Sequence, residues 1–232
     1  MNDDYHDPEL GPILDLARPV RADAALDCGC GAGQLAFSLA PVVATIEAID
    51  DDAGVLKEAE RLAAELHVGG IIFRRADLRA LPYSAGRFSL VVGYRVLHLQ
   101  ADPAAILREM ARVLSGGGRI VVDEPLVDES TDRHFNELAR LREPAHWRHY
   151  RVEEYEELFR ECGLRVTEIR QVRRSVDLDY WIEAAQTPVR NAEMIRERVR
   201  SLPVPVQAAM DVTFADRRVS FSYGVLVARL ER

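Results

Sequence analysis

Glycine recurs at alternate positions directly after an apolar run near the start of the chain. The segment reads Asp27-Cys28-Gly29-Cys30-Gly31-Ala32-Gly33, and a helical pattern, Gln34–Leu39, follows it. Glycines at such a junction let a ligand approach the backbone, and the start of the helix offers free N–H groups. A dinucleotide loop would need a glycine at position 34, which is Gln34. The segment therefore predicts a small-ligand site and disfavours a nicotinamide dehydrogenase.

Acidic residues follow this and two later apolar runs. Asp27 stands two residues before Gly29, where a carboxylate would favour a ligand that carries cationic groups. Asp50 ends the next run, at a distance from the loop suited to contact with ribose hydroxyls, and Asp77 follows the third. Because the carboxyl ends of parallel strands meet at one edge of a sheet, we expect these acids to share one crevice.

Short apolar runs alternate with helical patterns along the chain, which is typical of an α/β fold with a parallel sheet. Asp51 or Asp52 is placed to cap one helix, and Asp102 to cap another that begins at Pro103. A helix from near Thr131 and another over 152–162 are expected later in the chain. The expected strands are Ala24–Cys28, Thr45–Asp50, Ile71–Arg75, Phe88–Val92, Arg119–Asp123, Leu164–Val172 and Val219–Val227.

These motifs, in this order, resemble class I S-adenosylmethionine-dependent methyltransferases, and among them the type 11 branch with the ubiquinone and menaquinone biosynthesis methyltransferases. The resemblance is good from Asp27 to Glu124 and looser from Glu143 to Gly163. Two positions depart from the family pattern, since Ser89 stands where Asp is common and Gly116 where Pro is frequent.

The resemblance implies that the glycine loop holds the methionine part of S-adenosylmethionine, Asp50 the ribose and Asp77 the adenine amine. After transfer, the same residues would hold the product, S-adenosylhomocysteine. The full set of cofactor-binding residues that it implies is Asp27, Gly29, Cys30, Gly31, Gly33, Asp50, Asp51, Asp77, Leu78, Tyr94 and Arg95.

The resemblance also implies a Rossmann-like fold with helices on both faces of a seven-stranded, mostly parallel sheet. Its strand order would be 3-2-1-4-5-7-6, with the last strand antiparallel. We expect residues 1–232 to form one domain, with a core over about 20–172 and 217–230. The long insertion over about 173–216 is expected to form a helical lid, because such insertions in compact domains commonly cover a binding site.

Methyl transfer from a sulfonium is an in-line displacement, so the protein must align the acceptor and exclude water. A base is needed only for an acceptor that loses a proton, and His98 and Glu124 are the candidates, although each could serve a structural hydrogen bond instead. The resembling family often has a His-x-Arg-x-Tyr-like segment at the active-site mouth. Contacts to the acceptor are therefore expected from His146, Tyr150 and Trp181.

No metal site is expected from the sequence. His134, His146 and His149 could form one, but no carboxylate or cysteine with metal-ligand spacing supports them.

Composition narrows the partners. Thirty basic and thirty-eight acidic residues give a net charge of −8, which repels a nucleic-acid backbone. The arginines at 190–200 alternate with glutamates, as on a solvated helix face. The opening residues lack a secretory signal pattern, no apolar run is long enough to span a bilayer, and three cysteines are too few for a disulfide framework, so a cytoplasmic protein is expected.

The favoured hypothesis is a methyltransferase that acts on a small molecule through an O-, C- or N-nucleophile. An alternative is a regulator or partner subunit that binds the cofactor without turnover, since no catalytic base is unambiguous. The acceptor stays open, as does the pairing of two copies into a homodimer.

Overall fold

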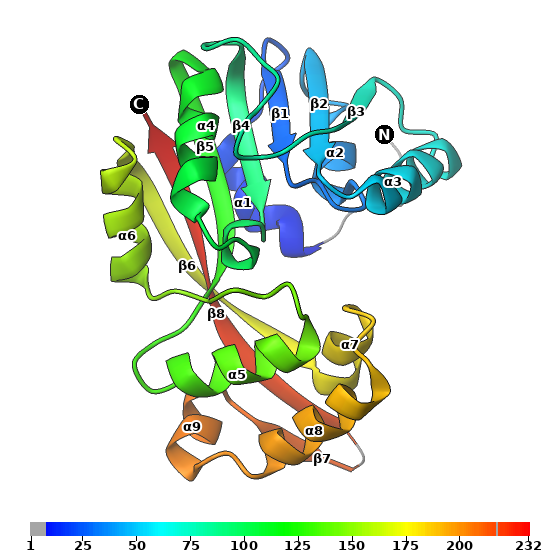
Figure 1. Ribbon diagram of the computed structural model, residues 1–232, viewed down its shortest axis with the longest axis vertical. Helices are drawn as coiled ribbons and strands as arrows, with labels where there is room; N and C mark the ends of the chain where they lie inside the picture. The colour runs from blue at the N-terminus through cyan, green and yellow to red at the C-terminus, as the bar shows by residue number, and fades with distance from the viewer. Residues whose placement is uncertain (1–7, 217) are drawn as a thin grey trace.

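The computed structural model describes residues 8–216 and 218–232. Residues 1–7, where no secretory signal is expected, and residue 217, where the predicted core resumes, lie outside the described residues. A twisted sheet runs through the molecule in the order β3-β2-β1-β4-β5-β8-β6, with β7 added beside β8 (Figure 1). Strand β8 is antiparallel to β5 and β6, whereas the pairs from β3 to β5 are parallel.

The predicted strand order 3-2-1-4-5-7-6 is confirmed. The strand predicted as the seventh is β8 in the structure, and it lies between β5 and β6. The number of strands was wrong, since the three-residue β7 makes eight. The first three strands have the predicted bounds, and the later ones extend further. The strands are β1 (Ala24–Cys28), β2 (Thr45–Asp50), β3 (Ile71–Arg75), β4 (Phe88–Tyr94), β5 (Leu114–Leu126), β6 (Arg165–Asp177), β7 (Thr213–Ala215) and β8 (Arg218–Glu231).

Helices cover both faces of the sheet, as predicted. Asp52 accepts hydrogen bonds from the backbone N–H groups of Gly54 and Val55 and so caps α3, and Asp102 caps α4 through Ala105. The helices are η1 (Pro8–Leu10), α1 (Gly11–Ala17), α2 (Gln34–Leu39), α3 (Ala53–Glu65), η2 (Leu97–Leu99), α4 (Pro103–Val113), α5 (Asp132–Arg142), α6 (Val152–Glu161), α7 (Leu178–Glu183), α8 (Val189–Arg200) and α9 (Val204–Ala209).

Alternation along the central strands divides the core into two layers. Leu90 and Val92 of β4 face the layer that contains α1 and α2, whereas Val91 faces the layer that contains α4 and α6. Strand residues that point to opposite faces in turn can bury both faces only when helices cover each side. The apolar runs in the sequence are therefore central strands of a covered sheet.

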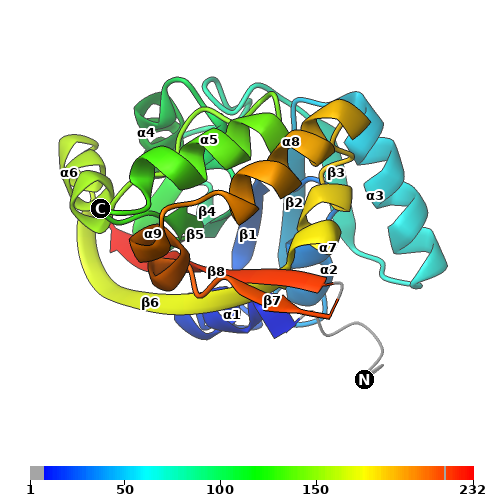
Figure 2. The ribbon, with the colours of Figure 1, turned by 90° about the horizontal axis from the view of Figure 1, so that it is seen from below.

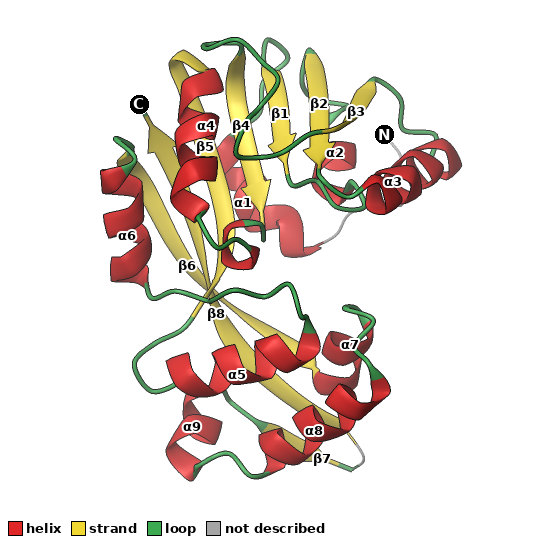
Figure 3. Cartoon of the chain, in the orientation of Figure 1, coloured by secondary structure: helices red, strands yellow, loops and turns green. Residues whose placement is uncertain are grey.

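The long strands β6 and β8 carry the sheet from an upper lobe into a lower one (Figures 1 and 3). The lower lobe consists of α5, α7, α8 and α9 packed against these strands and β7, and α5 and α8 lie side by side (Figure 2). The predicted insertion over 173–216 includes part of β6, since that strand continues to Asp177. The helical part of the insertion is thus shorter than predicted.

No helix among the described residues is long and apolar enough to cross a membrane. The three cysteines are free thiols.

A buried ion pair joins the amino-terminal ends of three neighbouring strands. Asp23 accepts hydrogen bonds from Arg119 at 3.0 and 2.6 Å and from the Ser89 hydroxyl at 2.7 Å. Ser89 in turn accepts a hydrogen bond from the backbone N–H of Ala24 at 3.1 Å. Because a hydroxyl can donate and accept at once, Ser89 serves here as an aspartate could not.

Removal of this carboxylate gives the first prediction. Burial raises the pKa of Asp23, but the hydrogen bonds from Arg119 and Ser89 outweigh it and lower the pKa to about 2. A carboxyl whose pKa is lower in the folded than in the unfolded protein stabilises the fold at pH values above its unfolded pKa of 3.8. This stabilisation is lost as the pH falls through the folded pKa. Asp23→Asn should therefore lower the free energy of unfolding by about 2 kcal/mol at pH 7, and by roughly half as much at pH 3. Denaturant unfolding at both pH values measures this, and an equal loss at both would contradict it.

Candidate functional site

The glycine loop is held against the end of β2. The backbone N–H groups of Gly29 and Cys30 donate to the carbonyl oxygen of Ile49 at 2.8 and 2.9 Å, and the Gly31 N–H donates to Asp50 Oδ2 at 3.0 Å. All three glycines have positive φ angles, and a Cβ on Gly29 would lie 2.5 Å from the Val96 side chain. A Cβ on Gly31 would meet nothing within 4 Å. The loop therefore needs glycine for its fold at position 29, whereas position 31 opens onto space.

Asp27 lies beneath this loop and is 1% exposed. Neither carboxyl oxygen has a hydrogen bond of normal geometry, although the nearby backbone N–H of Ala36 acts to lower the pKa of the group. Burial and the nearby charge of Asp50 raise the pKa of Asp27 to about 7. An unpartnered carboxyl at a strand tip is suited to a cationic group, because such a group would compensate the cost of burying the charge.

The other predicted acids lie along the same edge of the sheet. Asp50 caps the turn after β2 by accepting the Asp52 N–H at 3.0 Å, and its carbonyl oxygen accepts the Ala76 N–H at 3.0 Å. Asp77 is exposed and pairs with Arg79 at 3.0 Å. Asp51 is also exposed, whereas Leu78 is buried against the loop, 3.5 Å from where a Gly29 Cβ would stand. The predicted convergence of the three acid-bearing strand ends is thus found.

Cys30 is buried, and burial raises the pKa of its thiol. Its Sγ atom lies 3.7 Å from the carbonyl oxygen of Gly31, so the side chain packs within the loop.

The two predicted bases form one hydrogen-bonded pair. Glu124 of β5 is fully buried, and its carboxylate accepts the backbone N–H groups of Val96 and Leu97 at 2.8 and 2.7 Å. His98 of η2 places Nδ1 2.7 Å from Glu124 Oε2. Because the Glu124 oxygens are occupied, this residue orients His98, whose other ring nitrogen is left for a ligand.

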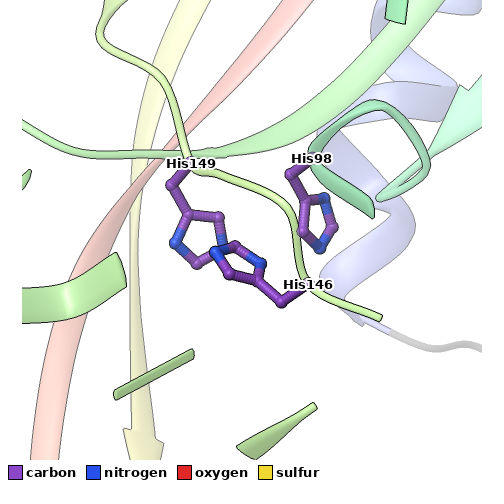
Figure 4. A group of neighbouring side chains, drawn as sticks. All are labelled: His98, His146 and His149. Atoms are coloured by element: carbon purple, nitrogen blue, oxygen red, sulfur yellow. The ribbon is translucent and has the colours of Figure 1, made fainter. Parts of the chain in front are cut away.

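The segment over 143–150 folds onto η2. The backbone N–H groups of Trp147 and Arg148 both donate to the carbonyl oxygen of His98 at 3.0 Å. This brings His146 and His149 against His98, with ring centroids 5.6 and 5.1 Å from it. Figure 4 shows the three rings gathered in one place. His134 lies elsewhere, beside α8.

A small cavity of about 50 Å³ borders these rings. Trp181 of the insertion and Arg142 of α5 form part of its wall, and the Arg142 guanidinium lies 4.8 Å from the Trp181 ring centroid. Arg95 lines the cavity too, and Tyr94 stacks beneath it. The structure therefore places Arg95 on the side where an acceptor was expected.

The structure does not bring Tyr150 to this cavity. Its backbone forms a bridge with Leu126, and its ring packs against Tyr155 with centroids 5.3 Å apart. Tyr150 belongs to the core beside α6, away from His146 and Trp181, although the sequence pattern grouped it with them.

A larger cavity of about 500 Å³ lies between α5, α9 and the strands β6 and β8. It shares two aromatic residues, Phe135 and Tyr223, with the small cavity. Four residues that line the small cavity were not predicted as site residues from the sequence: Phe135, Tyr223, Arg142 and His149. Their periodicity marks only buried helix and strand faces, and no sequence signal shows which cavity such a face borders.

Comparison with known proteins supports the geometry. Residues 26–122 match the family described as "Methyltransferase domain". By sequence, this segment is similar to methyltransferase domains. YcgJ, an uncharacterized methyltransferase of Bacillus subtilis, is 27% identical over 193 residues, which cover 81% of this chain and 75% of that protein. The 27-O-demethylrifamycin SV methyltransferase of Amycolatopsis mediterranei is 27% identical over 221 residues, 91% of this chain and 79% of that one.

Solved structures of methyltransferases share the fold. The crystal structure of YcgJ superposes with a TM-score of 0.89 at 24% identity and covers 97% of this chain and 98% of its own. A geranyl diphosphate methyltransferase in complex with S-adenosylmethionine has a TM-score of 0.65 at 18% identity, and covers 95% of this chain and 84% of its own. The chain thus shares the Rossmann-like fold of these methyltransferases.

Proposed function

We propose that this protein transfers a methyl group from S-adenosylmethionine to a small-molecule acceptor. The observation that carries the proposal is the buried, unpartnered carboxyl of Asp27 beneath an open glycine loop. S-adenosylmethionine is a cation with an ammonium and a sulfonium group and no phosphate, and it fits this charge. Its chemistry would supply an electrophilic methyl group that an acceptor nucleophile can displace in line.

Each part of the cofactor has a counterpart at the strand tips. Asp27 and the open face of Gly31 would hold the methionine part, Asp50 the ribose and Asp77 the adenine amine. Both Asp77 oxygens already bond Arg79, but a carboxylate oxygen accepts more than one hydrogen bond and so retains capacity. The geranyl diphosphate methyltransferase complex, which shares the fold, gives additional support for this cofactor.

His98 is the residue that we expect to contact the acceptor. With Nδ1 directed at Glu124, the opposite nitrogen can accept a proton from an acidic nucleophile or hold the acceptor by a hydrogen bond. Glu124 acts through His98 as a positioning residue. His146 and Trp181 would form the wall around the reacting group, and the insertion that carries Trp181 would exclude water as a lid.

The room around the rings limits what can enter. The small cavity is too small for a whole drug-sized molecule, whereas the neighbouring 500 Å³ cavity is in the usual range for such ligands. We propose that the reacting end of the acceptor enters the small cavity and that the larger one receives the rest. Relatives named for rifamycin and geranyl diphosphate methyl transfer support a small organic acceptor.

The cofactor site is tested by a matched pair of glycine substitutions. Gly31 and Gly70 both have positive φ angles and open space where a Cβ would stand, but Gly70 lies in the turn before β3, away from the loop. Gly31→Ala should weaken the binding of S-adenosylhomocysteine by about tenfold or more, the equivalent of roughly 1.4 kcal/mol. Gly70→Ala should bind as the parent does. Calorimetry should show one site per chain, and equal affinities for both variants would contradict the assignment.

Turnover is tested separately with labelled cofactor and a panel of phenols, quinones, amines and carboxylic acids. Label should pass to at least one acceptor, and His98→Gln should slow that transfer by about 100-fold, the usual range for loss of a general base, without weakening cofactor binding. Binding of S-adenosylhomocysteine without transfer to any acceptor would favour a regulator or partner subunit.

A further inference from the structure

His98, His146 and His149 form a cluster in which one ring nitrogen of each lies within 4.8 Å of the others. All three side chains are buried, at 6%, 5% and 4% exposure. Three imidazoles bound to one tetrahedral ion would place their nitrogens roughly 3.3 Å apart, for bonds of about 2.0–2.1 Å. Rotations of the rings that bring the nitrogens closer by up to about 1.5 Å would therefore complete a ligand set.

Hydrogen bonds outside the cluster determine which nitrogen of His98 is free. The Glu124 carboxylate accepts backbone N–H groups on both oxygens, so it acts as the acceptor toward His98 Nδ1. His98 Nε2 then carries the lone pair. A carboxylate behind a histidine is the arrangement that orients histidine ligands in metal sites.

A second hydrogen-bonded contact does the same for His146. The backbone of His149 fixes the Asn136 amide, since its N–H donates to Asn136 Oδ1 at 2.6 Å and its carbonyl oxygen accepts from Nδ2 at 3.1 Å. His146 Nε2, 3.0 Å from Asn136 Oδ1, must therefore be the donor. The Nδ1 lone pair of His146 is left available for a ligand.

His149 completes the group of three. Its Nδ1 is buried without a hydrogen-bond partner, and the other ring nitrogen is the one that lies on the side of His146 in Figure 4. The hydrogen bonds to Glu124 and Asn136 thus leave a lone pair on His98 and on His146, and an imidazole lone pair is what binds a metal ion.

The charges around the cluster do not exclude a cation. The two arginines in the cavity wall are each matched by a carboxylate, Arg95 by Glu9 and Arg142 by Glu143. Glu124 remains as a buried negative group at the cluster itself. The volume of about 50 Å³ also fits an ion with a bound water, given about 30 Å³ for one water in the liquid.

We propose that His98, His146 and His149 bind one divalent transition-metal ion of the zinc class. Three histidines with a fourth position open to a cavity are the pattern of catalytic rather than structural zinc sites. The open position faces the space assigned above to the reacting end of the acceptor, and there an acceptor oxygen could replace the water. With the ion bound, His98 Nε2 would be a ligand, so the ion would take over from His98 the activation of the acceptor. These roles toward the acceptor rest on the proposed methyl transfer, whereas metal binding itself does not.

We expected no metal from the sequence because no carboxylate or cysteine with metal-ligand spacing accompanies His134, His146 and His149. The fold replaces His134 with His98, which is distant in sequence from the other two.

Titration with Co²⁺ tests the site directly. Protein without an affinity tag, freed of metal by a chelator, should bind one equivalent of Co²⁺ with visible absorption bands typical of four-coordinate geometry, and Zn²⁺ should abolish them. His149→Phe keeps the stacking on Phe135, whose ring centroid lies 4.7 Å away, and removes both ring nitrogens. This variant should remain folded and should bind Co²⁺ at least about tenfold more weakly.

His134→Gln is the matched control and should bind Co²⁺ as the parent does. Absence of stoichiometric binding in the parent, or equal affinity in His149→Phe, would overturn the proposal. Binding of S-adenosylhomocysteine is measured on the same samples. If the parent binds S-adenosylhomocysteine but no Co²⁺, only the metal site is refuted. If it binds Co²⁺ but no S-adenosylhomocysteine, only the cofactor assignment is refuted.

Discussion

A buried carboxyl without a partner is the constraint on which the cofactor site depends. Asp27 is the penultimate residue of β1, an interior strand of the sheet, and its side chain is buried. The loop above it is held by hydrogen bonds to Ile49 and Asp50, and Asp50 itself adds negative charge. The protein thus keeps two acids together that destabilise one another. A cationic ligand at the loop would relieve that cost, which gives the arrangement a physical reason.

The second half of the site depends on one short turn after β4. The Glu124 carboxylate accepts hydrogen bonds from the backbone N–H groups of this turn. The carbonyl oxygen of His98 accepts hydrogen bonds from the 143–150 segment. The same turn contacts the glycine loop through Val96. The turn over 96–98 therefore lies between the cofactor loop and the histidine cluster and contacts both.

Local patterns predicted the elements well because the information lies close in sequence. The loop glycines, the helix caps at Asp52 and Asp102 and the first three strands all follow from residues within a few positions of each other. The extra strand β7 was missed, since three exposed residues give no apolar pattern and form a strand only by pairing with β8.

Long-range contacts explain the other differences. His98 joins His146 and His149 because backbone N–H groups of one loop bond a carbonyl of another, and such bonds carry no side-chain signature. Tyr150 was grouped with His146 by proximity in sequence, but a bridge to Leu126 turns it into the core. The contribution of Arg142 required the packing of α5 against the insertion, which periodicity does not specify.

The measurement closest to the central claim is the number of protons released when S-adenosylmethionine binds. Asp27 has a pKa of about 7 in the free protein, so close to half of the molecules hold its proton at pH 7. Calorimetry in buffers of different ionisation enthalpy should show release of about half a proton at pH 7 and about one at pH 5, because the free protein holds this proton fully at pH 5 and the bound cation keeps the carboxylate ionised. No binding, or binding with no proton release at pH 7 in the parent, would contradict the account.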